Sequence, residues 1–349
     1  MILFISDEIA GGTHSVPPAM FDRFPVYTFF RHLLPGILPR GYFMNYNEFL
    51  QTLRTQLLPL FSEGTSISTQ TVVKNNGISQ EALIIREPHT NLAPLIYLED
   101  YYRLYTREGA SMDELCSIVY DVFLESRLNH PVDANRFTDF EKARNNLIFQ
   151  VVNYEKNALR LSDLVHIRYL DLAIVFCCLL RMENGQDSTA LIHREHLRLW
   201  NVDADTVKKQ ALINTPRLLP AYIQPLTDAL RDLVSCNPAL NRLLPDSFGR
   251  ESSSLYVLTN ETQTHGASCM FYPSLLQEFA ESVSADLYVL PSSIHEVLLL
   301  PTNTRNADER LCALVRSVNG SQIPPAQILS DTVYFYSREK AAFIYDRRS

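Results

Sequence analysis

Four side chains close together near position 294 carry the residue types of a hydrolytic site: Ser292, Ser293, His295 and Glu296. A hydrolase triad needs a hydroxyl, an imidazole and a carboxylate that converge, with the base about 3 Å from the nucleophile. On an extended chain Ser293 and His295 share a face, whereas Glu296 points to the other one. No Gly-x-Ser-x-Gly elbow surrounds either serine. We therefore interpret the segment as a turn whose hydroxyls bind local backbone groups, and keep a hydrolase as the alternative.

A pair of histidines, His193 and His196, is the second candidate. Histidines three residues apart share one helical face and can hold a metal ion, with Glu195 as a third ligand or a base. The zincin motif, however, spaces its histidines four apart and takes its third ligand from elsewhere. Glu195 also suits the positive end of a helix dipole. We therefore favour an ordinary helix start and expect no metal and no other cofactor; Walker, dinucleotide and EF-hand motifs are absent from the sequence.

Two other groupings favour packing over chemistry. Cys269 follows His265 by four residues, and such a pair can act as nucleophile and base, but its apolar neighbours indicate an inert thiol. A tyrosine stripe can stack on bases or on a ring ligand, yet its spacing also buries one face of a helix, which we favour. The stripe comprises Tyr97, Tyr101, Tyr102 and Tyr105.

Two polar loops between expected strands are the candidate binding residues. The first separates SISTQTVV from ISQEALIIRE, and the second follows LIFQVV. Asn and Gly readily adopt positive φ, so the first loop is typical of a tight β-hairpin turn. Polar loops between strands, and the edges of exposed hairpins, can bind an extended partner. The loop residues are Lys74, Asn75, Asn76, Asn153, Tyr154, Glu155, Lys156 and Asn157.

The composition is that of a globular protein. The chain has 349 residues, of which 46% are hydrophobic and 20% charged, and its net charge is -8. An acidic chain without a Lys/Arg run disfavours nucleic-acid binding. The six cysteines form no CxxC pair and predict reduced thiols in the cytoplasm. We expect no membrane association, because no apolar run reaches the length of a span and the first residues lack the features of a secretory signal.

Strand and helix signals alternate along the chain. The pattern strand, turn, strand, helix occurs at about 67–107, 170–200 and 254–283. In the first unit, Pro94 opens a helix that ends at Gly109. In the third, SLYVLTN and ASCMFY form the hairpin before the helix. We predict an α+β fold in which repeated β-hairpin-plus-helix units form antiparallel sheets with helices packed on one face.

The expected domain organisation starts at Met44. Prolines interrupt residues 1–43, which we interpret as an extension outside the domain or as a mis-assigned start; an extension packed on the domain is the alternative. An N-terminal α+β region then spans 44–215, with a helix that Thr215-Pro216 stops. A proline-rich helical connection spans 216–250, and a C-terminal α+β region spans 251–349.

Several strings together resemble a domain-of-unknown-function family of anaerobic, mostly gut-dwelling bacteria. The strings are VVKNNG, IYLEDYY, VVNYEKN, LDLAIVF and DLYVLPSSIHEVLLLP. The resemblance runs from about residue 44 to about residue 339. It implies a bacterial, intracellular protein and supports Met44 as the start, but it brings no activity, cofactor or catalytic residue.

Three classes of function stay open. We favour a non-catalytic interaction or regulatory protein that binds another protein or a peptide. The alternative is a hydrolase that uses Ser292 or Ser293 with His295, or a metal at His193 and His196. A nucleic-acid accessory protein would need a basic face that only folding can assemble, and we consider it the least supported of the three.

Overall fold

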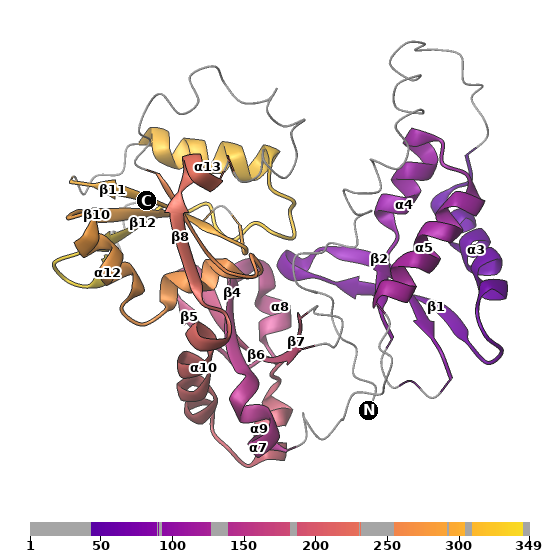
Figure 1. The fold of residues 1–349 in the computed structure, drawn as a ribbon, viewed down its shortest axis with the longest axis horizontal. Helices are drawn as coiled ribbons and strands as arrows, with labels where there is room; N and C mark the ends of the chain where they lie inside the picture. Colours follow the sequence, from indigo (N-terminus) through magenta and orange to yellow (C-terminus); the bar gives the residue numbers. More distant parts are fainter. Residues whose placement is uncertain are drawn as a thin grey trace, which may run out of the picture. The chain divides into compact units, whose positions relative to one another are not determined.

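The computed structural model describes residues 43–88, 90, 93–126, 139–181, 187–229, 231, 255–291, 293–303 and 309–344. Their contacts form two compact units, which we describe separately (Figure 1). Unit 1 comprises the described parts of Met1–Lys74, Ser79–Ala134 and Leu180–Ala190, and unit 2 those of Asn75–Ile78, Asn135–Leu179 and Leu191–Ser349. None of the helices among the described residues has the length and apolarity needed to cross a membrane.

Unit 1 begins with a helix whose start is encoded locally. Asn45 caps α3 (Tyr46–Leu57): its side chain accepts from the Glu48 N–H, and the Glu48 carboxylate accepts from the Asn45 N–H. Ser111 and Glu114 make the same reciprocal contacts before α5 (Met112–Ser126). The other elements of unit 1 are the 3-10 turn η1 (Leu58–Leu60), the strands β1 (Ser66–Val73), β2 (Ser79–Arg86) and β3 (Leu95–Tyr97), the helix α4 (Glu99–Arg103) and the π-helical turn η3 (Leu104–Glu108).

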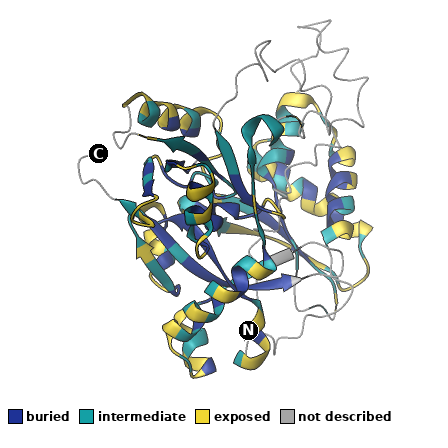
Figure 2. Ribbon diagram, turned by 60° about the vertical axis from the view of Figure 1, so that its left-hand side comes forward, coloured by how far each residue is buried: buried dark blue, intermediate teal, exposed yellow. Residues whose placement is uncertain are grey.

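The sheet of unit 1 is antiparallel, in the order β1-β2-β3. The predicted hairpin is confirmed: β1 and β2 pair residue for residue from Ser66↔Arg86 to Val73↔Ser79. Alternate side chains of the sheet, among them Ile67 and Ile85, join the apolar faces of α3 and α5 in one buried cluster. The helices of the molecule carry buried and exposed residues on opposite sides, as amphipathic helices do (Figure 2).

The helix expected after Pro94 starts later than predicted. Leu95–Tyr97 is the strand β3, because its backbone pairs with Ala82–Ile84 of β2. The helix begins only at Glu99 and ends at Gly109, whose φ of 71° is the left-handed helix end expected from glycine. The tyrosine stripe is therefore divided, with Tyr97 on the strand and the fully buried Tyr101 in the helical cluster.

Unit 2 contains two antiparallel sheets. Six strands form one sheet in the order β13-β12-β10-β11-β9-β8, and four form the other, in the order β4-β6-β5 with β7 also paired to β6. The strands are β4 (Leu147–Asn153), β5 (His166–Tyr169), β6 (Leu172–Arg181), β7 (Asp187–Leu191), β8 (Ala221–Pro225), β9 (Tyr256–Asn260), β10 (Asp286–Leu290), β11 (Val297–Thr302), β12 (Tyr334–Ser337) and β13 (Ala342–Ile344).

The helices of unit 2 are mostly short, and α10 packs along β4. The helices are α7 (Phe140–Ala143), α8 (Ala158–Leu161), α9 (Arg194–Trp200), α10 (Ala204–Leu218), α12 (Leu275–Ser282) and α13 (Glu309–Ser321), with 3-10 turns η2 (Asn75–Gly77), η4 (Arg144–Asn146), η5 (Glu155–Asn157) and η7 (Gly266–Phe271). The turn η2 is the tip of the β1–β2 hairpin, and its contacts place it in unit 2.

The structure confirms an α+β fold with antiparallel sheets but not the predicted repeat. In the third expected unit, ASCMFY forms the 3-10 turn η7 instead of a strand. The turn begins at Gly266, whose backbone lies so close to Thr259 and to the His295 carbonyl that an added Cβ would collide with both. Only β9 remains of that hairpin, and it pairs with β8 and β11 instead.

The expected helix end at Thr215-Pro216 is wrong by one turn. The helix α10 continues to Leu218 with Pro216 inside its last turn, where the Leu219 N–H still bonds to the Thr215 carbonyl. The expected helical connection 216–250 also contains the strand β8, which pairs with β9. Residues 1–42 and 232–254 lie outside the described residues, so the predicted boundaries near 43 and 250 stay predictions.

Candidate functional site

The Ser293 hydroxyl takes part in a local turn between β10 and β11. Its oxygen accepts from the backbone N–H groups of His295 (3.0 Å) and Glu296 (3.3 Å), and its proton is donated to Glu296 Oε1 at 2.7 Å. The imidazole of His295 takes no part in these bonds, so the serine–histidine contact that a hydrolase triad needs is not made by Ser293. This is the structural role that the sequence favours over catalysis. Ser292 lies outside the described residues.

Two histidines meet beside this turn. The rings of His265 and His295 have centroids 5.8 Å apart, and the His265 N–H donates to His295 Nδ1 at 3.4 Å. Thr259 Oγ1 donates to the His295 carbonyl at 2.8 Å, which fixes the backbone of the turn. Cys269 is fully buried, and desolvation raises the pKa of its thiol to about 12. A neutral thiol is a poor nucleophile, so the geometry gives Cys269 a packing role.

His193 and His196 form the start of α9. The backbone N–H of His193 donates to His196 Nδ1 at 2.9 Å, the contact that a Gln or Glu makes in a capping box. His193 contacts a residue outside the helix: its Nδ1 lies 2.7 Å from Asp163 Oδ2. The ring centroids of His196 and Trp200 lie 5.6 Å apart. Among the described residues, no group of three or more His, Cys, Asp or Glu side chains is arranged to hold a metal ion.

The partly buried position of His196 is expected to make unit 2 sensitive to acid. Desolvation, and next the charge of His193, lower the pKa of His196 below its usual 6.5. The unfolded chain then binds more protons below about pH 6.5, so protonation of this residue weakens folding as the pH falls through that range and has no effect above it. We expect the tryptophan fluorescence of the folded chain to change with a midpoint below pH 6.5, because the imidazolium forms beside Trp200.

His196→Gln is the matched control, since glutamine keeps the capping acceptor without titrating. Its fluorescence should be flat from pH 7 to pH 5, and its stability should fall less with acid than that of the unsubstituted chain. Equal pH profiles for the two proteins would contradict this assignment.

The structure brings the two asparagine-rich loops together within unit 2. Asn76 and Asn157 exchange two hydrogen bonds: the Asn76 N–H donates to Asn157 Oδ1 at 3.0 Å, and Asn157 Nδ2 donates to Asn76 Oδ1 at 3.1 Å. Asn75, Asn153 and Asn157 are buried. The Asn76 φ of 60° is a left-handed conformation that asparagine tolerates.

The asparagines hold a segment of the same unit, residues 325–330. Asn76 Nδ2 donates to the carbonyls of Pro325 (2.8 Å) and Ile328 (2.7 Å), and Asn75 Nδ2 donates to that of Ala326 at 2.7 Å. The remaining carbonyls of the segment accept from the Ile294 N–H, from Asn153 Nδ2 and from Asn319 Nδ2. Each of the six carbonyls in 325–330 thus has a donor, although the segment is neither helix nor strand. We call this arrangement the asparagine clamp.

The charged members of the two loops lie elsewhere. The Lys74 ammonium lies 3.3 Å from the centroid of the Tyr97 ring in unit 1. In unit 2, Arg168 lies over the Tyr154 ring at 4.1 Å and forms an ion pair with Glu155 at 3.0 Å. The Lys156 N–H donates to Asn153 Oδ1 at 2.9 Å. These contacts fix the shape of the loops.

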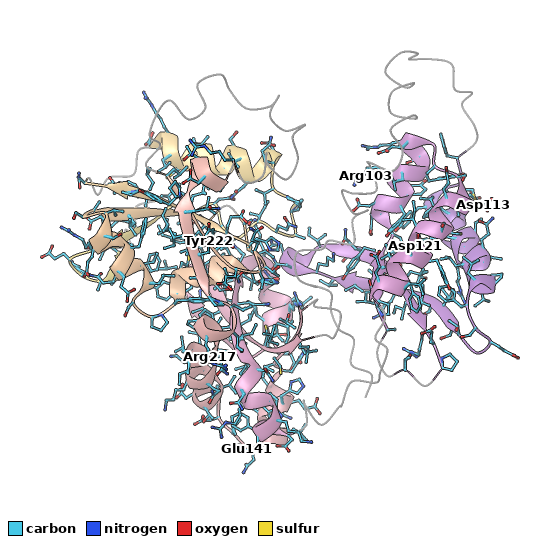
Figure 3. The ribbon with its side chains drawn as sticks, in the orientation of Figure 1. Arg103, Asp113, Asp121, Glu141, Arg217 and Tyr222 are labelled. Carbon is cyan, nitrogen blue, oxygen red and sulfur yellow. The ribbon has the colours of Figure 1, made fainter. Side chains whose placement is uncertain are left out.

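The outer edge of β1 is the feature of unit 1 best suited to bind a partner. In the sheet order, β1 is an end strand, and within the described residues no strand pairs with its outer side. Six of its eight residues are exposed. An end strand presents a row of backbone N–H and C=O groups to which another strand can pair. Charged side chains such as Arg103 and Asp113, labelled in Figure 3, lie on the helices, whereas Ser66–Val73 contains no charge and no proline.

The other sheet ends in the described part of the chain are short or covered. The strands β3, β5 and β13 have three or four residues each, and β7, which pairs only with β6 among the described strands, has five. The strand β4 is buried at all seven positions. The strand β8 has five residues, of which the last is Pro225, a residue typical of protected edges. The β1 edge is longer than all of these and carries none of these protective features.

A family model covers residues 46–338, from the first residue of α3 to the residue after β12, and its description is "Family of unknown function (DUF5688)". The chain belongs to this family. The match confirms the resemblance found in the sequence and includes the described residues of both units apart from a few at the two ends. No curated protein and no solved structure matches the chain.

In this DUF5688 chain, the sequence predicts the two polar loops as binding residues and does not single out the β1 edge. The hairpin is predicted from the sequence, and hairpin edges can pair with a partner. The order of strands in a sheet, however, is not visible in the sequence. The usable signal was compositional: eight strand residues without charge or proline, in a chain that is 20% charged.

Proposed function

We propose that this member of DUF5688 is a protein-interaction module, and that the β1 edge binds an extended segment of a polypeptide by strand addition. The observation that carries the proposal is the exposed, uncharged edge of eight residues in regular register with β2. Strand addition uses backbone groups for affinity and alternate side chains for specificity. Such a module acts as a regulator when the segment that it binds belongs to a protein whose activity changes on binding.

Backbone pairing can supply part of the affinity at this edge. In an antiparallel pair, about half of the residues of a strand point their N–H and C=O groups toward a given side. Each hydrogen bond contributes about 1 kcal/mol net. Ordering a flexible partner and losing its free motion oppose this gain. Because a micromolar Kd needs about 8 kcal/mol net, we expect the backbone bonds alone to give binding weaker than micromolar, and contacts of alternate side chains to supply the rest.

The side chains of β1 indicate the chemistry of the partner. Ser68 and Gln70 lie on one face of the sheet, and Thr69 and Thr71 on the other, the face of Ile67 that α3 and α5 cover. Hydroxyl and amide groups suit an uncharged, extended segment rich in Thr, Val or Ile. A strongly charged peptide would gain nothing from β1 itself.

The geometry described for Ser293, His295 and Cys269 does not favour the hydrolase alternative. The Ser293 proton is donated to Glu296, and the Cys269 thiol is buried and neutral at physiological pH. The histidines at the start of α9 are used in capping and in the contact with Asp163. An interaction role needs none of these groups.

The test selects displayed random peptides on the immobilised full-length chain. The edge variant Ser68→Lys/Gln70→Lys places two lysines on the β1 edge, which is how natural edges are protected. Gln51→Lys/Thr55→Lys is the matched control, with the same charge change on the exposed side of α3. We expect selected peptides to bind the unsubstituted chain and the control equally, and the edge variant at least tenfold more weakly.

Unchanged circular dichroism must first show that both variants fold. Equal binding by the edge variant would contradict the proposal, as would the absence of any peptide that binds above background to a chain that is monomeric in solution.

A further inference from the structure

We infer that the strand that binds to the β1 edge is β1 of a second copy of this chain, so that two unit 1 sheets join into one continuous antiparallel sheet. This inference rests on the proposed function, because it names the occupant of that same edge. Strand addition between identical edges about a two-fold axis is an isologous contact, in which each copy offers the same surface.

The first argument is the charge pattern of β1. Charged residues in the middle of an edge strand repel their own copies, since a two-fold axis brings the central side chains of the two strands close together. Between Glu63 and Lys74 the chain contains no charged residue. An antiparallel pairing brings the carboxyl end of one β1, next to Lys74, beside the amino end of the other, next to Glu63. Opposite signs then meet at both ends of the pair, whereas a parallel pairing would bring like signs together.

The second argument is the exposed apolar surface at the ends of β1. Leu58 and Leu60 of η1, just before the strand, are 49% and 45% exposed, and Val73, its last residue, is 51% exposed. The two-fold axis of such a pair is perpendicular to the sheet, so the helical layers of both copies lie on the same side. Val73 is six residues from Ile67 along the strand, so its side chain points to the same face of the sheet as that of Ile67, the face covered by the helices.

Val73 of one copy therefore lies on the helical side, next to the start of the other copy's β1. In that second copy, η1 with Leu58 and Leu60 leads into the same end of the strand. The pairing thus brings exposed apolar groups of the two copies together at each end, and their burial adds to the backbone hydrogen bonds. An unrelated peptide would not supply the second η1.

The same symmetry limits the possible registers. Because both sheets keep the same face, directly opposite residues must be an even number of positions apart, and the two registers that pair most of β1 place Thr69 or Gln70 at the axis, opposite its own copy. With Thr69 at the axis, Ser68 of each strand lies opposite Gln70 of the other. With Gln70 at the axis, the two Gln70 side chains meet and Ser68 lies opposite Val72. Substitutions at these two positions therefore test the pairing in either register.

The experiment is sedimentation equilibrium of the full-length chain over a range of concentrations. We expect a monomer–dimer equilibrium, retained by Gln51→Lys/Thr55→Lys and weakened at least tenfold by Ser68→Lys/Gln70→Lys. Ser68→Glu/Gln70→Glu should weaken it to a similar extent. An equimolar mixture of the lysine and glutamate variants should recover a dimer, because opposite charges now face each other across the pair.

Three outcomes would overturn this inference: a monomer at every concentration, a dimer that the edge substitutions do not weaken, or a mixture that fails to restore association. If the chain is monomeric but selected peptides still bind at β1, only the identity of the occupant is wrong. If neither association nor peptide binding depends on β1, the proposed function is wrong as well.

Discussion

Replacing Gly266 with alanine is expected to lower the free energy of unfolding of unit 2 by about 3 kcal/mol. An added Cβ would lie 2.1 Å from Thr259 Oγ1, 2.4 Å from the His295 carbonyl oxygen and 2.8 Å from the Asn260 nitrogen. Two of these atoms are backbone, so no change of rotamer relieves the contact. The strand β9 and the turn before β11 would have to move apart.

The measurement is denaturant unfolding followed by tryptophan fluorescence. Trp200 is the only tryptophan of the chain and is buried in unit 2, so the signal reports on that unit. Gly320→Ala is the matched control: it lies in α13 with nothing within 4 Å of an added Cβ. Alanine should be neutral there or stabilise the helix by about 0.5–1 kcal/mol. A Gly266→Ala protein as stable as the control would contradict the close packing of η7 against β9.

Replacing Asn76 tests the asparagine clamp. Asn76→Gly keeps the left-handed backbone but removes two donors to the 325–330 segment and one acceptor, and we expect it to destabilise unit 2 by about 2 kcal/mol. Asn76→Asp keeps the shape and the acceptor for Asn157. It places a carboxylate against the carbonyls of Pro325 and Ile328, so we expect the larger loss, about 3 kcal/mol.

The fluorescence of Trp200 again measures the loss. The control is Gln322→Glu, the same change from amide to carboxylate at an exposed position close in sequence to the clamped segment, which should stay within about 0.5 kcal/mol of the unsubstituted chain. If aspartate at position 76 is tolerated as well as glycine, the amide of Asn76 does not hold the segment in the way described.

Local signals in the sequence are informative where neighbouring residues determine the structure. Asn45 with Glu48, and Ser111 with Glu114, mark two helix starts through contacts that span three residues. The β1–β2 hairpin follows from the positive φ available to Asn76 and Gly77. Contacts with the rest of the chain are not needed to define these elements.

The errors arose where distant residues determine the structure. Leu95–Tyr97 has a helical pattern but pairs with β2, so tertiary pairing overrides local preference. The sequence predicts a strand at ASCMFY, but the segment forms the 3-10 turn η7, which begins where Gly266 lies close against β9. Nothing near Gly266 in the sequence reveals that contact.

The candidate sites show the same division. The local role of the Ser293 hydroxyl was visible in the sequence because all of its partners lie within three residues. The partners of Asn76 lie 81 to 252 residues away, so the sequence suggested that its loop binds something but not that it binds residues 325–330. Which strand ends a sheet is equally hidden, and the β1 edge emerged only from the strand order.

The most direct test of strand addition at β1 is residue-resolved amide hydrogen exchange of the dilute full-length chain, with and without a saturating selected peptide. A strand that pairs at the edge protects only the amides that point outward, so protection should appear at every second residue of Ser66–Val73. The amides of β10 and β11, which are paired on both sides within their own sheet, should not change. Protection that avoids β1, or that spreads over the chain without a period of two, would contradict the account.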